Sequence, residues 1–302
     1  PTPARLKLIL LSALLLILLG SVVGAVLMYR NRGSGEPGPP VVFVPDGFQR
    51  AGDAGVKTAG GRTVYEQIAH VFPDKTDLVF VLIPKTRSDD PEPFYMLRDK
   101  VTNHAFAQFA AEQPEAIRDK GWRQGAAGEN DIPLGVDDFP FHPVVRVSVD
   151  DAHRFAGWLK GELPTAQQWD KAAGRFDGAV GPFVGDGRGL RNEDWGVGLG
   201  KLLPVNRPTP AVTLFGCRDM AGNGYEWTRS VRGDDERARV PFDDPGWNDR
   251  ISLRAQTYFA DTPYRFSGRP NSRHRFQDPQ SKDAGASPEV GFRVVLELQS
   301  AP

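Results

Sequence analysis

The feature that most constrains this chain is an unbroken apolar run near its start. Residues 8–29 read LILLSALLLILLGSVVGAVLMY, which is 22 residues without a charge. At a rise of about 1.5 Å per residue, a helix of this length spans the ~30 Å hydrocarbon core of a bilayer. Cations that can reach the lipid headgroups flank the run on both sides: Arg5, Lys7, Arg30 and Arg32. We therefore predict a transmembrane helix at this position.

The main alternative to a membrane helix is a cleaved signal peptide. The run is longer than the roughly 7–15 residues of an ordinary signal-peptide core, and no small-residue cleavage site follows it. We therefore expect a tail of residues 1–7, a retained helix over 8–29 and a linker over 30–40. Gly20 and Gly24 form a G-x-x-x-G pattern that can bring a second helix close, although ordinary glycine usage in a membrane helix explains them equally well. The flanking cations are balanced and do not decide the orientation.

The rest of the chain, residues 41–302, is predicted to form one α+β domain. In the whole chain 37 basic and 38 acidic residues nearly cancel, and the two signs are interspersed. This pattern lacks the one-sided basic surface of nucleic-acid-binding proteins, so we expect no nucleic-acid partner. The chain has one cysteine, Cys217, which excludes an internal disulfide and any site built from a pair of its cysteines.

The first part of the domain contains two short β-branched runs, at 41–44 and 78–83, that predict strands. Between them, the spacing of Val64, Ile68 and Val71 predicts a helix over 61–72.

Further helices are predicted where a hydroxyl residue can cap an apolar face: 101–113 with Thr102, 148–161 with Ser148, and 165–175 with Thr165. Between residues 177 and 290, Gly, Pro, Asn and Asp dominate, so regular structure is expected to be sparse.

Four segments of the domain fall in a specific order: FYMLRDKVTNHAFAQF (94–109), HPVVRVSVDDAHRFAGWLKGELPTAQQWDKAAG (142–174), LFGCRDMAGNGYEWTRS (214–230) and VGFRVVL (290–296). Over residues 78–297 this order resembles the formylglycine-generating enzyme family, also called sulfatase-modifying factor domains. That family combines E-V-T-N, L-P-T-E-A-E-W-E-x-A-A, G-L-x-D-M-x-G-N-V-x-E-W and a final G-F-R. The resemblance implies a loop-rich fold that is similar to C-type lectins.

The resemblance also implies a calcium ion at the turn within DMAGNGYEW. Carried over to this sequence, its oxygen ligands would come from Asn223, Gly224 and Glu226. The alternative is that Asn223 and Glu226 only form hydrogen bonds within their own loop. A second calcium site, which would use Asn192, is not expected because the surrounding sequence matches poorly.

The catalytic members of the family oxidise a substrate cysteine by means of two cysteines that hold Cu(I) shortly before G-F-R. The corresponding stretch here, residues 264–293, contains no cysteine, and Cu(I) prefers thiolate ligands. We therefore expect no copper and no formylglycine-generating activity. Cys217, outside this stretch, is interpreted as a small buried residue.

Other branches of the family use iron bound by histidines from an additional helical domain. The five histidines of this chain are scattered, so no iron site is expected: His70, His104, His142, His153 and His274. His153 is interpreted as a structural residue.

The stretch before G-F-R contains a group of cations instead of cysteines: Arg265, Arg269, Arg273, His274 and Arg275. One interpretation is a groove for an anion, a carbohydrate or an acidic loop of a partner protein. The other is that these cations form ion pairs with acids nearby in the sequence: Asp243, Asp244, Asp249 and Asp261.

These observations predict a membrane-anchored, non-catalytic binding or scaffolding subunit. Its partners would be the bilayer and other membrane proteins of a larger complex. The resemblance places the domain on the extracytoplasmic, periplasmic side of a cytoplasmic membrane, with a single pass. An enzyme of altered chemistry on the same fold, and a sensor or glycan-binding module, remain the alternatives.

Overall fold

The computed structural model describes residues 41–117, 120–125, 135–231, 251–266, 275–277 and 287–298. By its contacts the chain divides into two units, residues 1–41 and 42–302, and the elements described below belong to the second. In the described ranges no helix has the length and apolar character needed to cross a bilayer. The predicted membrane helix, its Gly20 and Gly24, and the linker lie outside these ranges and stay predictions.

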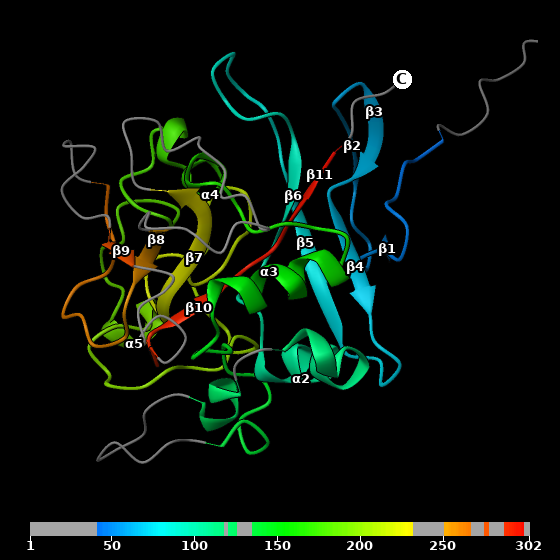
Figure 1. Ribbon diagram of the computed structural model, residues 1–302. Helices are drawn as coiled ribbons and strands as arrows, with labels where there is room; N and C mark the ends of the chain where they lie inside the picture. Colours follow the sequence, from blue (N-terminus) through cyan, green and yellow to red (C-terminus); the bar gives the residue numbers. More distant parts are fainter. Residues whose placement is uncertain are drawn as a thin grey trace, which may run out of the picture. The chain divides into compact units, whose positions relative to one another are not determined.

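Two sheets form the frame of the domain (Figure 1). The first has the order β1-β4-β5-β6-β11 with every neighbouring pair antiparallel. Its strands are β1 Gln49–Arg50, β4 Gln67–Val71, β5 Asp77–Ile83, β6 Phe94–Leu97 and β11 Val295–Glu297. The second has the order β10-β7-β8-β9, in which β10 runs parallel to β7. Its strands are β7 Gly224–Val231, β8 Ile251–Gln256, β9 Arg275–Gln277 and β10 Val290–Phe292.

The chain passes directly from the second sheet into the first. Only Arg293 and Val294 separate β10 from β11, and Figure 1 shows this red segment running between the two sheets. Any group that holds Arg293 therefore helps to fix the sheets relative to each other.

The predicted helix caps are confirmed. Helices α2 (Asn103–Glu112), α3 (Val149–Trp158) and α4 (Ala166–Ala172) begin after Thr102, Ser148 and Thr165, respectively. Each hydroxyl accepts a hydrogen bond from the backbone N–H three residues on, at 3.1–3.2 Å. In the part of the chain that the structure describes, the shorter helices are α5 (Asn192–Trp195) and three 3₁₀ turns, Pro114–Ala116, Gly121–Gln124 and Arg175–Asp177.

Helices α2 and α3 pack against the junction of the sheets through aromatic rings. Phe106 of α2 lies 5.8 Å from Phe155 of α3, measured between ring centroids, and Phe155 lies 5.4 Å from Phe292 of β10. All three side chains are fully buried and belong to the largest apolar cluster of the described residues. These aromatic rings therefore contribute buried apolar surface to this junction.

The helix predicted over residues 61–72 is wrong. This segment forms β3 (Arg62–Tyr65), which pairs with β2 (Val56–Ala59), and then β4. Gly60 and Gly61, both with positive φ, make the two-residue hairpin turn between β2 and β3. The short apolar spacing fits both a helix and two strands, and the Gly–Gly turn decides in favour of strands.

Two other expectations need correction. Residues 41–44 do not form a strand, since Phe43 makes only an isolated bridge to Val64. Regular structure is sparse from 178 to 223, where α5 is the only helix or strand, but the long strands β7 and β8 follow. Their side chains are buried on both faces, so they lack the alternation that makes a strand visible in a sequence.

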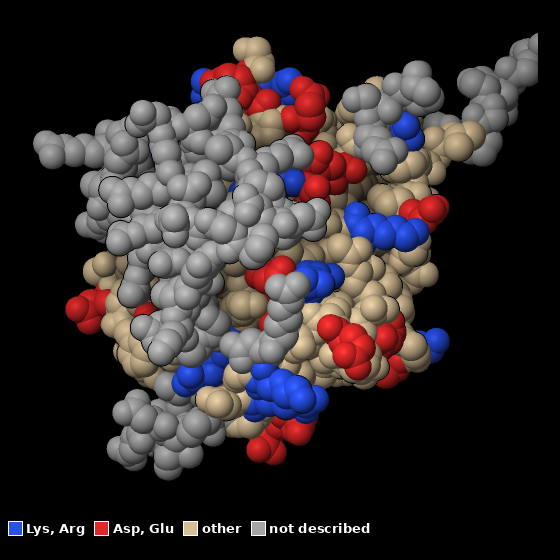
Figure 2. Space-filling model, in the orientation of Figure 1, with Lys and Arg blue, Asp and Glu red and all other residues tan. Residues whose placement is uncertain are grey.

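The surface of the described residues carries both charge signs next to each other. Figure 2 shows Lys and Arg side chains interspersed with Asp and Glu on one face. Exposed ion pairs such as Lys57 with Glu66, at 2.6 Å, contribute to this pattern. Such pairs stabilise a fold by only about 0–1 kcal/mol each, so the fold depends on buried groups instead.

Replacing Phe292 with Ala is expected to lower the free energy of unfolding by about 3–5 kcal/mol, because it leaves a cavity between α2, α3 and β10. Urea unfolding followed by circular dichroism measures this loss. The matched control is Phe259→Ala, since that side chain is 50% exposed and its removal is expected to cost less than about 1 kcal/mol. Equal losses in the two variants would contradict the packing described.

Candidate functional site

The segment DMAGNGYEW, residues 219–227, forms a tight turn that leads into β7. Asn223 and Gly224 have φ values of 59° and 97°, in the left-handed region that Asn tolerates and Gly favours. A Cβ atom at Gly222 would lie 2.2 Å from the carbonyl oxygen of Trp195, so only glycine fits there. The turn therefore presents Glu226 on β7 to the interior of the domain.

Glu226 is fully buried and lies at the centre of an ion cluster. One carboxylate oxygen accepts hydrogen bonds from Lys100 and, at 2.9 Å, from Nη2 of Arg293. The other accepts from Nε of Arg293 at 2.6 Å and from the indole Nε1 of Trp169 at 2.8 Å. The side chains of Lys100 and Arg293 are also buried, at 1% and 0% exposed. We call these four residues the Glu226 cluster.

The remaining donors of the cluster bind backbone carbonyl groups. Arg293 Nη1 donates to the carbonyl oxygens of Leu97 and Arg98, at 3.0 and 2.9 Å, and Nη2 donates to that of Arg218. Lys100 donates to the carbonyl oxygen of Asp219 at 3.1 Å. The cluster thus joins the end of β6, the turn before β7 and the link between β10 and β11.

The electrostatics of the cluster favour an ionised carboxylate. Burial by itself raises the pKa of Glu226, but the charges of Arg293 and Lys100 outweigh it and lower that pKa to about 2. Burial lowers the pKa of Lys100, and the nearby positive charge of Arg293 lowers it further. The negative charge of Glu226 raises this pKa but only partly offsets the two effects. Burial by itself lowers the pKa of Arg293, but the charge of Glu226 outweighs this effect and raises it.

The side chains proposed as calcium ligands do not fit that role as they are placed. Both oxygens of Glu226 already accept hydrogen bonds from the cluster. Oδ1 of Asn223 accepts from the backbone N–H of Leu203 at 2.8 Å, and its Nδ2 donates to Leu203 O and to Asp219. Calcium binding at this turn stays a prediction, and it would need oxygens other than these.

Cys217 does not fit a copper site. It is fully buried, and its backbone N–H donates to the Thr213 hydroxyl. Burial raises the pKa of its thiol to about 12, so the thiolate that Cu(I) needs is not formed at neutral pH. The chain has no second cysteine to pair with it. No step through copper follows from this structure.

The predicted group of cations before G-F-R is described only in part. Arg265 donates to the carbonyl oxygen of Asp186 at 3.1 Å, and its guanidinium lies 5.0 Å from the ring centre of Phe183. Within the described ranges it makes no ion pair with Asp261. The backbone of Arg275 belongs to β9, while the following predicted residues lie outside the described ranges: Arg269, Arg273, His274, Asp243, Asp244 and Asp249.

His153 lies on α3 and is buried, as the sequence indicated for a structural residue. Burial, with a smaller effect of Arg229, lowers its pKa to about 2, so it is neutral at physiological pH.

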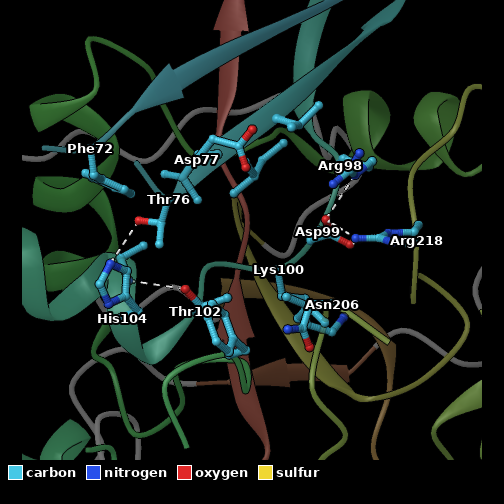
Figure 3. Close-up of a pocket in the computed structure, with 16 residues that line it drawn as sticks. Phe72, Thr76, Asp77, Arg98, Asp99, Lys100, Thr102, His104, Asn206 and Arg218 are labelled. Carbon is cyan, nitrogen blue, oxygen red and sulfur yellow. Dashed lines mark hydrogen bonds and ion pairs between the residues drawn. The ribbon is translucent and has the colours of Figure 1, made fainter. Parts of the chain in front are cut away.

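A pocket of about 240 Å³ opens at the start of β5 and the end of β6 (Figure 3). On one side, Arg218 makes a bidentate ion pair with Asp99, with both distances 2.6 Å, and Arg98 donates to Asp99 at 3.1 Å. On the other side, His104 Nε2 lies 2.9 Å from Asp74 and 3.0 Å from the Thr76 hydroxyl. We call this cavity the Asp99 pocket.

Sequence reasoning missed the partners of Glu226 and the residues of the Asp99 pocket. Lys100 is bonded to a residue 126 positions away and Arg293 to one 67 positions away, so no local pattern pairs them. A signal was present for Arg293, because a single charge inside VGFRVVL must be paired if the flanking apolar residues are buried. The Asp99 pocket had no such signal.

The comparisons with known proteins agree with this fold. The model of the Sulfatase-modifying factor enzyme 1-like domain matches residues 34–298. The chain is 32% identical over 120 residues to the Inactive C-alpha-formylglycine-generating enzyme 2 of Bos taurus, which covers 36% of this chain and 38% of that protein. It is 29% identical over 201 residues to the Formylglycine-generating enzyme of Mycobacterium tuberculosis. This alignment covers 58% of this chain and 63% of that protein.

A solved structure also resembles this chain. PvdO from Pseudomonas aeruginosa aligns with a TM-score of 0.50 and 19% identity, over 80% of this chain and 100% of that one, which shows a shared fold. The chain spans only 38–63% of the length of the two curated relatives, so their activities do not transfer with the match.

Replacing Glu226 with Gln is expected to lower the free energy of unfolding by about 3–5 kcal/mol, because two buried cations lose their counter-charge. The matched control is Glu92→Gln. The Glu92 side chain is 72% exposed in its ion pair with Lys85, so this substitution is expected to lower the free energy of unfolding by less than about 1 kcal/mol. Urea unfolding at neutral pH measures both.

The pH dependence of unfolding provides a second readout of this prediction. The pKa of Glu226 in the folded protein, about 2, lies below its ordinary value of 4.5. The stability that Glu226 contributes is therefore fully present above about pH 4.5 and is lost as the pH falls toward about 2. From about pH 5 to about pH 3 the wild type should therefore lose more stability than Glu226→Gln. Equal losses would contradict the ionised, paired state of this carboxylate.

Cys217 is expected to be unreactive in the native protein. With a pKa of about 12, about one thiol in ten thousand is ionised at pH 8, and burial blocks the reagent further. A chromogenic disulfide reagent should detect almost no thiol in the native protein and one per chain in urea. Stoichiometric reaction without urea would contradict the burial of this residue.

Proposed function

Because this chain belongs to the family of the sulfatase-modifying factor enzyme 1-like domain, we propose that it uses the family fold for binding rather than for catalysis. In this proposal it is a membrane-anchored subunit that holds its domain against a partner protein complex in the same membrane. A fold can keep its framework when the original chemistry is lost.

The observation that carries this proposal is the state of the only thiol. Cys217 is buried and has a pKa of about 12, and the stretch before G-F-R contains no cysteine. The oxidation of a substrate cysteine by paired thiolates therefore has no nucleophile in this chain. The resemblance to a relative that is named as inactive supports the same conclusion.

The intact framework supports a binding role over simple decay of the domain. The Glu226 cluster satisfies every oxygen of its carboxylate, and a cluster with a missing partner would destabilise the fold strongly. A chain that had lost every function would not be constrained to keep such a costly set of charges complete.

The apolar run at residues 8–29 supports the anchor in this proposal. A tether confines the domain to a membrane surface, and so raises its effective concentration near a partner in that membrane. We propose that the domain lies on the extracytoplasmic side. Protease protection in oriented vesicles distinguishes this orientation from the reverse.

The test is extraction of the full-length chain with a mild detergent, followed by native separation and cross-linking mass spectrometry. The chain is expected to migrate in an assembly with a fixed set of other membrane proteins, with cross-links from residues of its folded domain. Migration as a single chain in its detergent micelle would contradict the scaffolding role.

A second arm tests catalysis directly. A cysteine-containing peptide incubated with the purified chain and Cu(I) is expected to keep its thiol, as judged by mass. Oxidation of that thiol to an aldehyde would contradict the non-catalytic part of the proposal, whatever the migration of the protein.

A further inference from the structure

The Asp99 pocket holds charges of opposite sign at two separate places. Arg98 and Arg218 share the single carboxylate of Asp99, so this side carries an excess of positive charge. Asp77 also lines the pocket and carries the opposite charge (Figure 3). Lys100 does not alter this balance, because its ammonium group is engaged by Glu226.

The positive side keeps donors that the protein does not use. Arg98 bonds to Asp99 through Nε only, and among the described residues its two terminal nitrogens have no partner. Arg218 uses Nε and Nη2, which leaves Nη1. The side chains of Arg98 and Arg218 are 32% and 21% exposed, so a small solute can reach them. Guanidinium groups with free terminal nitrogens bind carboxylates well.

The negative side consists of Asp77 at the start of β5. No hydrogen bond or ion pair reaches its carboxylate from the part of the chain that the structure describes. The register places it near the arginines, since the backbone N–H of Arg98 donates to Val79 O and Asp77 precedes Val79 by two residues. Asp77 and Arg98 are thus diagonal neighbours, about 7–8 Å apart between Cα atoms, without an ion pair between them.

The rest of the lining is largely apolar. Phe72, Leu97, Phe141 and Val205 face the pocket, and Phe141 is 41% exposed although it is a large apolar residue. The volume of about 240 Å³ is below the roughly 300–1,000 Å³ of pockets for drug-sized ligands. The pocket therefore suits a small ligand with an apolar part and two charged ends.

We propose that the Asp99 pocket binds a free amino acid with an apolar side chain. Its carboxylate would bind the free nitrogens of Arg98 and Arg218, its ammonium group would bind Asp77, and its side chain would lie against the apolar lining. This goes beyond the scaffolding role, since it gives the domain a small-molecule ligand.

The two charged ends favour a zwitterion over simpler ligands of the same size. A ligand with only a carboxylate leaves Asp77 without a counter-charge, and a ligand with only an amine leaves the excess positive charge of the arginines. Binding of the zwitterion satisfies both ends at once. Separate probes that lack one group or the other therefore test the assignment.

The experiment is isothermal titration calorimetry of the detergent-solubilised full chain with L-phenylalanine and L-leucine. Saturable binding at one site is expected. The matched probes are 3-phenylpropionate, which lacks the ammonium group, and 2-phenylethylamine, which lacks the carboxylate. Each is expected to bind about tenfold more weakly than L-phenylalanine, or weaker still, because it loses a charge-assisted hydrogen bond.

Two variants assign the ends. Asp77→Asn should weaken the binding of L-phenylalanine by about tenfold or more and leave the affinity for 3-phenylpropionate unchanged. Arg98→Gln should also weaken the binding of L-phenylalanine but leave the affinity for 2-phenylethylamine unchanged. The controls Asp53→Asn and Arg188→Gln change exposed residues outside the pocket lining and should bind like the wild type.

The absence of saturable heat with both amino acids would overturn the proposal. So would unchanged affinity for L-phenylalanine in Asp77→Asn and Arg98→Gln, with folding of both variants verified by thermal unfolding. Neither result depends on a partner protein, so the scaffolding role is tested separately.

Discussion

The interaction on which the rest of this structure depends is the buried carboxylate of Glu226. It accepts hydrogen bonds from Arg293 between the two sheets, from Lys100 ahead of α2, and from Trp169 on α4. An unpaired charge in such a position costs several kcal/mol, so these segments gain stability only when all of them are in place. The sheets and helices of the domain are therefore expected to form cooperatively around this group.

This arrangement separates the framework of the family from its chemistry. The turn of DMAGNGYEW, the final G-F-R and the capped helix after LPT are joined by contacts that involve no thiol and no metal. A chain without a cysteine pair can therefore keep these folding interactions. The Asp99 pocket illustrates this point, because it lies where β5 begins and β6 ends and uses none of the stretch before G-F-R.

The sequence predicted the features that depend on contacts within one helical turn. It did not predict those whose local pattern fits two structures or whose partners are distant in the chain. The caps at Thr102, Ser148 and Thr165 could be predicted because each hydroxyl bonds to a backbone group three residues away. The segment 61–72 could not, because its apolar spacing over so few residues suits a helix as well as two strands. The buried strands β7 and β8 were missed since both of their faces are covered.

The sequence by itself determined the family, the position of the apolar run, the main helices and the lack of a cysteine pair. Each of these depends on residue identity or on contacts within one turn of the chain. Tertiary structure alone decided that Glu226 pairs with Lys100 and Arg293, and that Asp77, Arg98 and Arg218 line one pocket. These partners are far apart in the chain or lie on different strands, and only strand register and packing bring their charges together.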